Sequence, residues 1–199
     1  MASLLSHVNR FHLVLAVLWQ LSTFLSTQML FPIFANYTPA WRCLGPSNTS
    51  LPTDFSRDCT IRLQCTPDAL EYEPAMFQST AMDWDWVCNP ERSYLKRLYS
   101  QSQFIGVLVG MLVIGSLADV IGRKWISVVS LVGSAAAVAA SGLAIDATTL
   151  LASRFLLGFF IGAKVAYYTL FMEMVAPELR LPLKVVGNWV GSLHSHCLL

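Results

Sequence analysis

The chain has 199 residues, of which 55% are hydrophobic and only 13% are charged. Soluble domains carry about 25% charged residues, so this composition excludes a disordered chain and a conventional cytosolic enzyme. The net charge of +1 argues against a nucleic-acid partner, because no excess of positive charge is available to meet phosphates. The composition predicts a protein of the lipid bilayer, in which each span uses roughly 20 apolar residues.

Five apolar runs divide the chain into predicted spans and connections. The first follows Arg10 and is longer than the core of a signal peptide, about 7 to 15 residues, so we interpret it as an uncleaved helix. The fifth contains Lys184 and Asn188, and the chain stops within it. The expected order is a cytoplasmic N-terminus 1–10, first helix 11–34, outer loop 35–100, second helix 101–118, cytoplasmic motif loop 119–124, third helix 125–145, short outer loop 146–149, fourth helix 150–175, cytoplasmic loop 176–182 and partial fifth helix 183–199.

Basic residues in the short connections predict the orientation. Arg123 and Lys124 lie between the second and third helices, Arg180 follows the fourth, and residues 146–149 hold no Lys or Arg. Short loops rich in Lys and Arg stay in the cytoplasm. The N-terminus is therefore expected inside, and the long first loop is free to face outward.

That loop contains four of the five cysteines, which suggests two disulfides and an oxidising compartment. Three pairings are possible, and the sequence does not choose among them. The spacing of Cys59 and Cys65 does not suit a zinc pair, so no metal site is predicted. The four cysteines are Cys43, Cys59, Cys65 and Cys88.

Two glycosylation sequons lie in the same loop, at Asn36 and Asn48. A sequon is an acceptor for sugar in a secreted or outward-facing segment. Both agree with the outer placement, although Asn36 is close to the end of the first predicted helix.

Residues 115–124 (GSLADVIGRK) carry the most specific motif. Gly115 allows another helix to approach closely. Asp119 is an ionisable residue at the membrane edge that needs a partner such as Arg123. Gly122 permits a tight turn, and Arg123 and Lys124 hold that turn inside. The alternative is a basic stop-transfer loop that happens to contain glycines.

This motif resembles the gating signature of the major facilitator superfamily. Residues 83–88 (DWDWVC), 103–110, 153–158 (SRFLLG) and 173–180 are further similar to the organic cation and anion transporters, solute carrier family 22. The resemblance implies an all-α membrane protein that is the N-terminal part of this fold, with about five helices and a large disulfide-bonded outer loop. It also implies gating roles for Glu173 and Arg180. The family's loop usually has six cysteines, against four here, and its fold has twelve helices, so we expect a truncated product.

Two polar helix faces are candidates for a substrate cavity. On the first helix, Gln20, Thr23 and Thr27 fall within about 60° on a helical wheel. They would line an aqueous cavity, or equally they would form hydrogen bonds between helices.

On the fourth helix, Phe160, Lys164 and Tyr168 share one side with two further aromatic residues. In a cavity the lysine would attract anionic groups. Alternatively, Lys164 snorkels toward the membrane surface and the tyrosines belong to an interfacial belt. Gly158 and Gly162, turned away from Lys164, suit close packing on a neighbouring helix.

The leading functional hypothesis is a plasma-membrane secondary carrier of small organic ions. The sequence lacks a phosphate-binding loop and hydrolase motifs, so neither a cofactor nor an enzymatic activity is expected. Two alternatives stay open: a claudin-like adhesion or barrier protein, and a non-transporting regulatory fragment. Such a fragment would pair with the missing transporter half or with a full-length relative.

Overall fold

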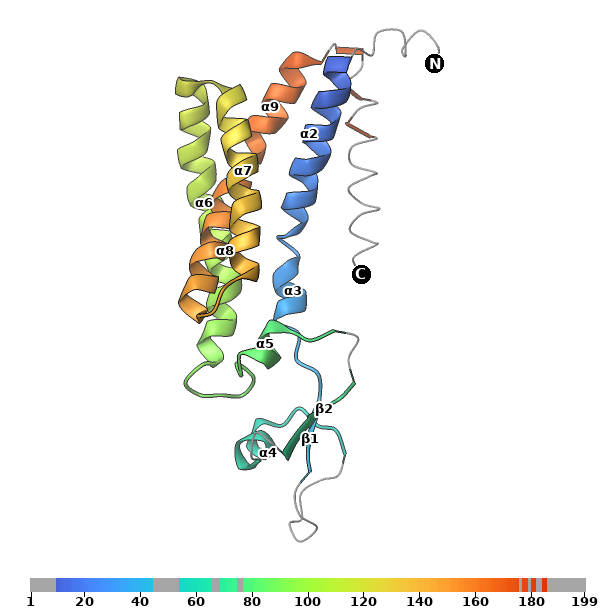
Figure 1. Ribbon diagram of the computed structural model, residues 1–199, viewed down its shortest axis with the longest axis vertical. Helices are drawn as coiled ribbons and strands as arrows, with labels where there is room; N and C mark the ends of the chain where they lie inside the picture. Colours follow the sequence, from blue (N-terminus) through green and yellow to red (C-terminus); the bar gives the residue numbers. More distant parts are fainter. Residues whose placement is uncertain are drawn as a thin grey trace. The chain divides into compact units, whose positions relative to one another are not determined.

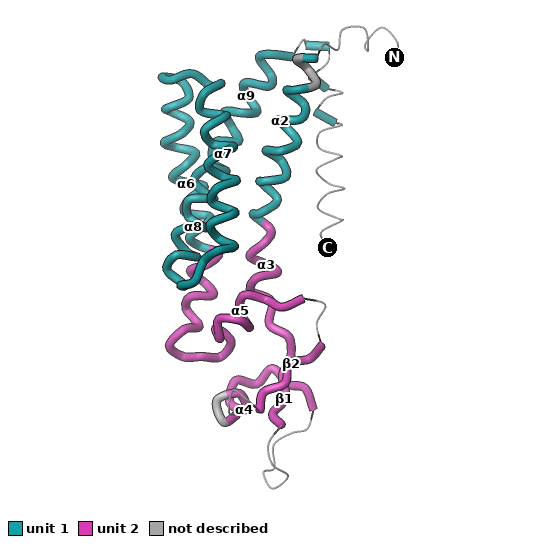
Figure 2. Tube along the Cα trace, viewed as in Figure 1, with its two compact units in different colours: residues 1–29, 101–199 teal, residues 30–100 magenta. Residues whose placement is uncertain are grey.

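The computed structural model describes residues 10–44, 54–65, 69–74, 77–175, 177, 178, 180, 181, 184 and 185. The chain divides into two compact units, which are considered separately (Figure 2). Unit 1 comprises Met1–Met29 and Gln101–Leu199, and unit 2 comprises Leu30–Ser100. Most of the predicted fifth helix, 183–199, lies outside the described residues.

Within the described ranges, four helical segments are long and apolar enough to cross a membrane. They agree with the first four predicted spans in order and character. Their bounds are Val14–Ala35, Ser93–Ile121, Arg123–Gly142 and Ala147–Met174.

Unit 1 is a helical bundle built from α2 (Arg10–Thr27), the part of α6 (Ser93–Ile121) after residue 100, α7 (Arg123–Gly142), α8 (Ala147–Ile161) and α9 (Lys164–Met174) (Figure 1). Helix α7 packs against α2, α8 and α9, and α2 also packs against α9. The buried residues of α7 are three serines, one alanine and Ile126.

The helix bounds differ from the predicted spans, most clearly at the start of α6 and at the motif loop. Helix α6 begins at Ser93 rather than residue 101, because residues 93–100 are polar but contain no helix breaker, and hydropathy detects only the apolar part. The predicted motif loop 119–124 shrinks to Gly122, since α6 continues to Ile121 and α7 begins at Arg123. Residues 119–121 are therefore helical.

Two predicted spans are interrupted helices. The first consists of α2 and the short α3 (Phe31–Ala35), with Pro32 in the first turn of α3, where proline needs no hydrogen-bonded N–H. The fourth consists of α8 and α9, separated by Gly162 and Ala163. Hydropathy alone reveals neither interruption, because both lie within continuous apolar runs.

Unit 2 contains the only strands among the described residues, so the expectation of an all-α protein needs a correction. Strand β1 (Trp41–Cys43) pairs antiparallel with β2 (Leu70–Tyr72), with Arg42 opposite Glu71. A two-stranded ribbon of this length is marginal by itself. Two disulfides accompany it, Cys43–Cys65 and Cys59–Cys88, which select one of the three possible pairings.

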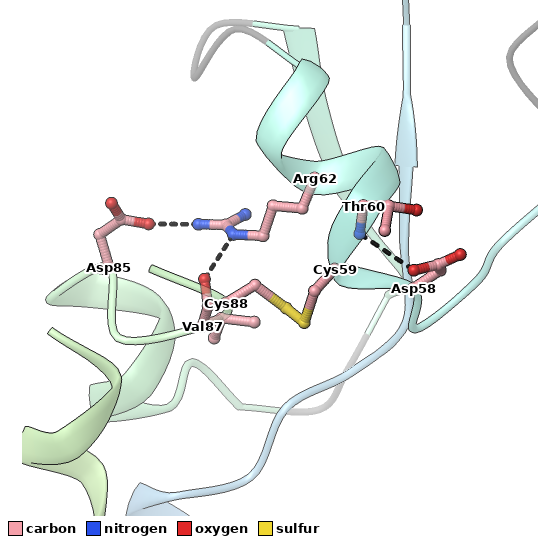
Figure 3. The surroundings of a disulfide bond; sticks show 7 residues. All are labelled: Asp58, Cys59, Thr60, Arg62, Asp85, Val87 and Cys88. Carbon is pink, nitrogen blue, oxygen red and sulfur yellow. Dashed lines mark hydrogen bonds and ion pairs between the residues drawn. A yellow bond between two sulfur atoms is a disulfide. The ribbon is translucent and has the colours of Figure 1, made fainter. Parts of the chain in front are cut away.

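The second disulfide joins α4 (Cys59–Gln64) to the segment before α6 (Figure 3). Arg62 reinforces this connection: its Nε donates to the carbonyl oxygen of Val87 at 2.7 Å, and its Nη2 pairs with Asp85. Asp85 and Cys88 adopt positive φ angles of 51° and 56°, which are uncommon without glycine. The disulfide and the Arg62 contacts hold this unusual backbone in place.

The start of α4 is capped by Asp58, whose carboxylate accepts the backbone N–H of Thr60 at 2.9 Å. This hydrogen bond lowers the pKa of Asp58. The short helix α5 (Thr80–Asp83) leads to Trp86, which is 1% exposed and packs on Tyr99 of α6 with ring centroids 5.9 Å apart. Unit 2 is therefore anchored to the first turns of α6 by an aromatic core of its own.

Candidate gating and substrate sites

One arginine joins three helices at the α6–α7 corner. Arg123 Nη2 lies 3.3 Å from Asp119 Oδ1 on α6, and its Nη1 pairs with Glu173 Oε1 on α9. Gly122, with a φ of +104°, makes the corner in a single residue, which leaves Arg123 four positions after Asp119. Both carboxylates are more than half exposed, at 69% and 57%.

The other predicted motif residues take no part in these two ion pairs. Lys124 is exposed, and a Cβ added to Gly115 would meet no atom of the described chain within 4 Å. Arg180 Nε donates to the carbonyl oxygen of Val175 at 3.0 Å, so it satisfies an acceptor just beyond the end of α9. The structure thus gathers Asp119, Arg123 and Glu173 into one ion-pair cluster.

Helices α6 and α8 approach each other at glycines. A Cβ added to Gly158 would lie 2.1 Å from the carbonyl oxygen of Gln103, and one added to Gly106 would lie 2.2 Å from that of Phe155. A Cβ added to Gly110 would lie 2.1 Å from the carbonyl oxygen of Phe159, and one added to Gly162 would lie 2.7 Å from the backbone nitrogen of Met111. The glycine pair predicted on the fourth span therefore packs against a second glycine pair on α6.

A small cavity of about 10 Å³ lies among α2, α7, α8 and α9. Such a volume accommodates about one water-sized group. Of the predicted cavity residues, Phe160 and Lys164 line it, whereas Gln20, Thr23, Thr27 and Tyr168 do not. The full lining is Ser22, Leu25, Ser26, Ser130, Leu131, Ser134, Phe160, Ile161, Lys164 and Tyr167.

The threonines predicted on α2 satisfy their hydroxyls within their own helix. Thr23 Oγ1 donates to the carbonyl oxygen of Trp19 at 3.0 Å, and Thr27 Oγ1 to that of Phe24 at 2.6 Å. Ser22 and Ser26, which are four residues apart, occupy the face that lines the cavity. The predicted stripe therefore lies beside the cavity face of α2.

Tyr168 belongs to an aromatic cluster. Its ring lies 5.8 Å from that of Trp19, and its hydroxyl accepts from Lys184 Nζ at 3.0 Å. Tyr167 takes the predicted place in the cavity lining, and its hydroxyl donates to the carbonyl oxygen of Ser127. A single continuous wheel places both tyrosines on this side, and helix packing decides which of them reaches the cavity.

Sequence reasoning missed the serines of α7. Ser127, Ser130 and Ser134 are each at most 4% exposed, and the last two line the cavity. Their spacing of three and four residues places them on one helix face, and this signal was available in the sequence.

The two sequons differ in what the structure describes. The Asn36 side-chain nitrogen donates to Ser100 Oγ at 2.8 Å, and the Asn36 Oδ1 is buried. Asn48 lies outside the described residues.

Comparison with known proteins identifies the family. The Sugar (and other) transporter family matches residues 65–189, which is more than half of the chain. The chain belongs to this family. It is a major facilitator superfamily protein and resembles the N-terminal part of solute carrier family 22 proteins. It is thus a multi-pass membrane protein of a class whose members are carriers and not enzymes.

Three relatives indicate how much of a transporter the chain covers. An uncharacterized protein of Caenorhabditis elegans is 33% identical over 187 residues, which are 92% of this chain and 37% of that protein. The beta-alanine transporter of Drosophila melanogaster is 35% identical over 124 residues, 61% of this chain and 20% of that protein. Human organic anion transporter 3 is 34% identical over 145 residues, 70% of this chain and 25% of that protein. The chain therefore spans well under half the length of these relatives.

Proposed function

We propose that this chain forms part of a plasma-membrane secondary carrier that moves small organic ions. The observation that carries the proposal is the cluster of Asp119, Arg123 and Glu173 at the α6–α7 corner. It connects three helices through side chains that reach solvent. Exposed ion pairs contribute little net stability, so this contact is suited to break and re-form during a transport cycle.

The same contacts suggest a mechanism. Alternating access requires helical bundles that rock about a central site. An ion pair that forms in one state and breaks in the other, here called the latch, would limit such motion reversibly. In this proposal Arg123 holds α9 against the α6–α7 corner, and release of Glu173 frees α9 to move.

The sidedness is also proposed. The basic residues Arg123 and Lys124 favour a cytoplasmic corner. The two disulfides of unit 2 favour an outward, oxidising location for residues 35–100. The family match favours transport over the adhesion-protein alternative.

Transport is proposed for a complete carrier. Because alternating access uses two bundles, we expect the 199-residue chain by itself to show no saturable uptake. The remaining length that the relatives have beyond the matched part would complete the site. Uptake by cells that express only this chain, above mock-transfected cells, would contradict this part of the proposal.

The experiment for the latch uses a chimera. This chain replaces the matching segment of human organic anion transporter 3, and uptake of a panel of organic cations, anions and zwitterions is measured. Glu173→Gln should lower the maximal uptake rate while leaving the substrate KM nearly unchanged, because the contact acts on the conformational cycle. Glu178→Gln is the matched control: Glu178 is exposed and makes none of the ion pairs of the described residues.

Two results would count against the proposal. If the chimera reaches the surface but carries no member of the panel, the assignment as an organic ion carrier fails. If Glu173→Gln and Glu178→Gln give the same maximal rate at equal surface expression, Arg123 and Glu173 do not form a latch.

A further inference from the structure

The cavity beside Lys164 takes no part in the ion pairs of Arg123. We propose that Lys164 and Ser130 form a subsite for the anionic group of an organic carboxylate. This inference rests on the proposed carrier function and specifies the charge of its substrate.

Lys164 brings a positive charge to the cavity lining. It is the first residue of α9, directly after the interruption at Gly162 and Ala163.

The depth of Lys164 in the span argues against simple snorkelling. It lies ten residues before the end of α9 at Met174, which is about 15 Å at the usual helical rise. The apolar core of a bilayer is about 30 Å thick, so Lys164 lies near its middle. The side chain is nevertheless exposed in this bundle, so a ligand has access to it.

The charge of Lys164 is not balanced by the cavity. No carboxylate is present in the lining, and Lys164 takes part in none of the ion pairs made by the described part of the chain. Ionisable groups within a membrane span usually have a partner of opposite charge. A bound anion would provide that partner.

Ser130 supplies a second donor of hydrogen bonds. It is 3% exposed, lines the cavity, and makes no side-chain hydrogen bond within the described residues. The other serines of the lining differ, because Ser22, Ser26 and Ser134 donate to carbonyl oxygens of their own helices. The Ser130 hydroxyl is thus available to an acceptor in the cavity.

The rest of the lining is largely apolar. Phe160 and Tyr167 bring aromatic rings to the cavity, and Leu25 and Leu131 add apolar surface. The space of about 10 Å³ accepts one oxygen of a carboxylate, so the remainder of the ligand extends outside the cavity, along the exposed side of Lys164. The charge of Lys164 favours a carboxylate over an organic cation.

The test measures protection of Lys164 from an amine-reactive ester. The 199-residue chain is placed in lipid nanodiscs, and modification of each lysine is followed by mass spectrometry. Benzoate is the probe, and benzamide is its neutral counterpart. At about ten times its Kd, benzoate should slow modification of Lys164 about tenfold and leave Lys96, in unit 2, unchanged. Ser130→Ala should raise the Kd of benzoate about tenfold, so that the same concentration slows modification of Lys164 only about twofold.

Ser141→Ala is the control for Ser130→Ala, because Ser141 is also on α7 but lies outside the cavity and donates to Val138. It should keep full protection. Unchanged modification of Lys164 in benzoate would overturn the inference, and equal protection by benzamide would show an apolar site instead. Protection by sodium chloride at the same concentration would assign the site to an inorganic anion and would equally overturn it.

The experiment separates this inference from the proposed transport. Binding is measured on the chain itself, so protection by benzoate without uptake by the chimera supports the subsite and rejects the carrier. Uptake by the chimera without protection of Lys164 supports the carrier and rejects the subsite.

Discussion

Replacing Gly158 by alanine tests the close contact between α6 and α8. The added Cβ would lie 2.1 Å from the carbonyl oxygen of Gln103, a backbone atom that no side-chain rotation can move. Real Cβ atoms are essentially never closer than 3.0 Å. The two helices must therefore separate by roughly 0.9 Å at this point, the difference between these two distances.

The energetic cost follows from this displacement. Overpacking of a tight interface costs about 1–3 kcal/mol. Alanine has a higher helix propensity than glycine, but this does not offset the cost of overpacking. The span is helical both in the packed bundle and after separation from its neighbour, so the propensity favours both states equally. A protein of this size loses roughly 2–4 °C in melting temperature per kcal/mol, so Gly158→Ala should melt about 2–12 °C lower.

Alanine substitutions at two further glycines serve as graded controls. Thermal unfolding of each variant is measured in detergent, with tryptophan fluorescence as the signal. Gly133→Ala meets only the Phe160 ring, at 2.6 Å, and this side chain is able to turn aside. Gly142→Ala meets nothing within 4 Å in the described chain. The melting temperature should rise from Gly158→Ala to Gly133→Ala to Gly142→Ala. A Gly158→Ala protein as stable as the Gly142→Ala protein would refute backbone contact between α6 and α8.

Three predictions concern unit 2. Peptide mapping without reduction should recover Cys59 linked to Cys88, and recovery of both as free thiols would contradict the structure. Endoglycosidase treatment followed by mass spectrometry should locate sugar on Asn48 and not on Asn36, because the Asn36 nitrogen that would carry it is bound to a hydroxyl; sugar on Asn36 would show that this hydrogen bond is absent. The hydrogen bond from Thr60 lowers the pKa of Asp58, so ionised Asp58 stabilises folded unit 2 at pH values above its ordinary pKa of 3.8. This stabilisation is lost as the pH falls through the lower pKa of the folded state. Replacement of Asp58 by Asn should remove this acid-dependent loss in a circular-dichroism titration, and an unchanged acid profile would reject the cap.

The apolar spans and the meeting of Asp119 with Arg123 were predictable because they depend on local patterns. Long apolar runs require helices, since a backbone in lipid must satisfy its own hydrogen bonds. Asp119 and Arg123 are four residues apart, and such a pair meets on any helix that continues through a tight corner. Their proximity needed little knowledge of the remaining fold, and the pairing of Arg123 with Glu173 follows from the return of the fourth span to the same end.

The residues that line the cavity were less predictable, because they depend on how each helix is rotated and on which helices pack together. The wheel of the fourth span placed both Tyr167 and Tyr168 on the side of Lys164, and only the packing shows that Tyr167 lines the cavity while Tyr168 packs on Trp19. On α2 the polar stripe was recognised, but which polar face meets α7 depends on how the two helices pack.

The sequence by itself determined the membrane class, the four described spans, the cysteine-rich loop and the basic corner, because each depends on composition or on residues close together in the chain. Only the tertiary structure decided which cysteines pair, since Cys59 and Cys88 are 29 residues apart and all three pairings satisfy the same sequence. It also decided that glycines of α6 and α8 face each other, and that Ser130 and Lys164 share a cavity. These are contacts between distant segments, and their formation depends on how the helices pack.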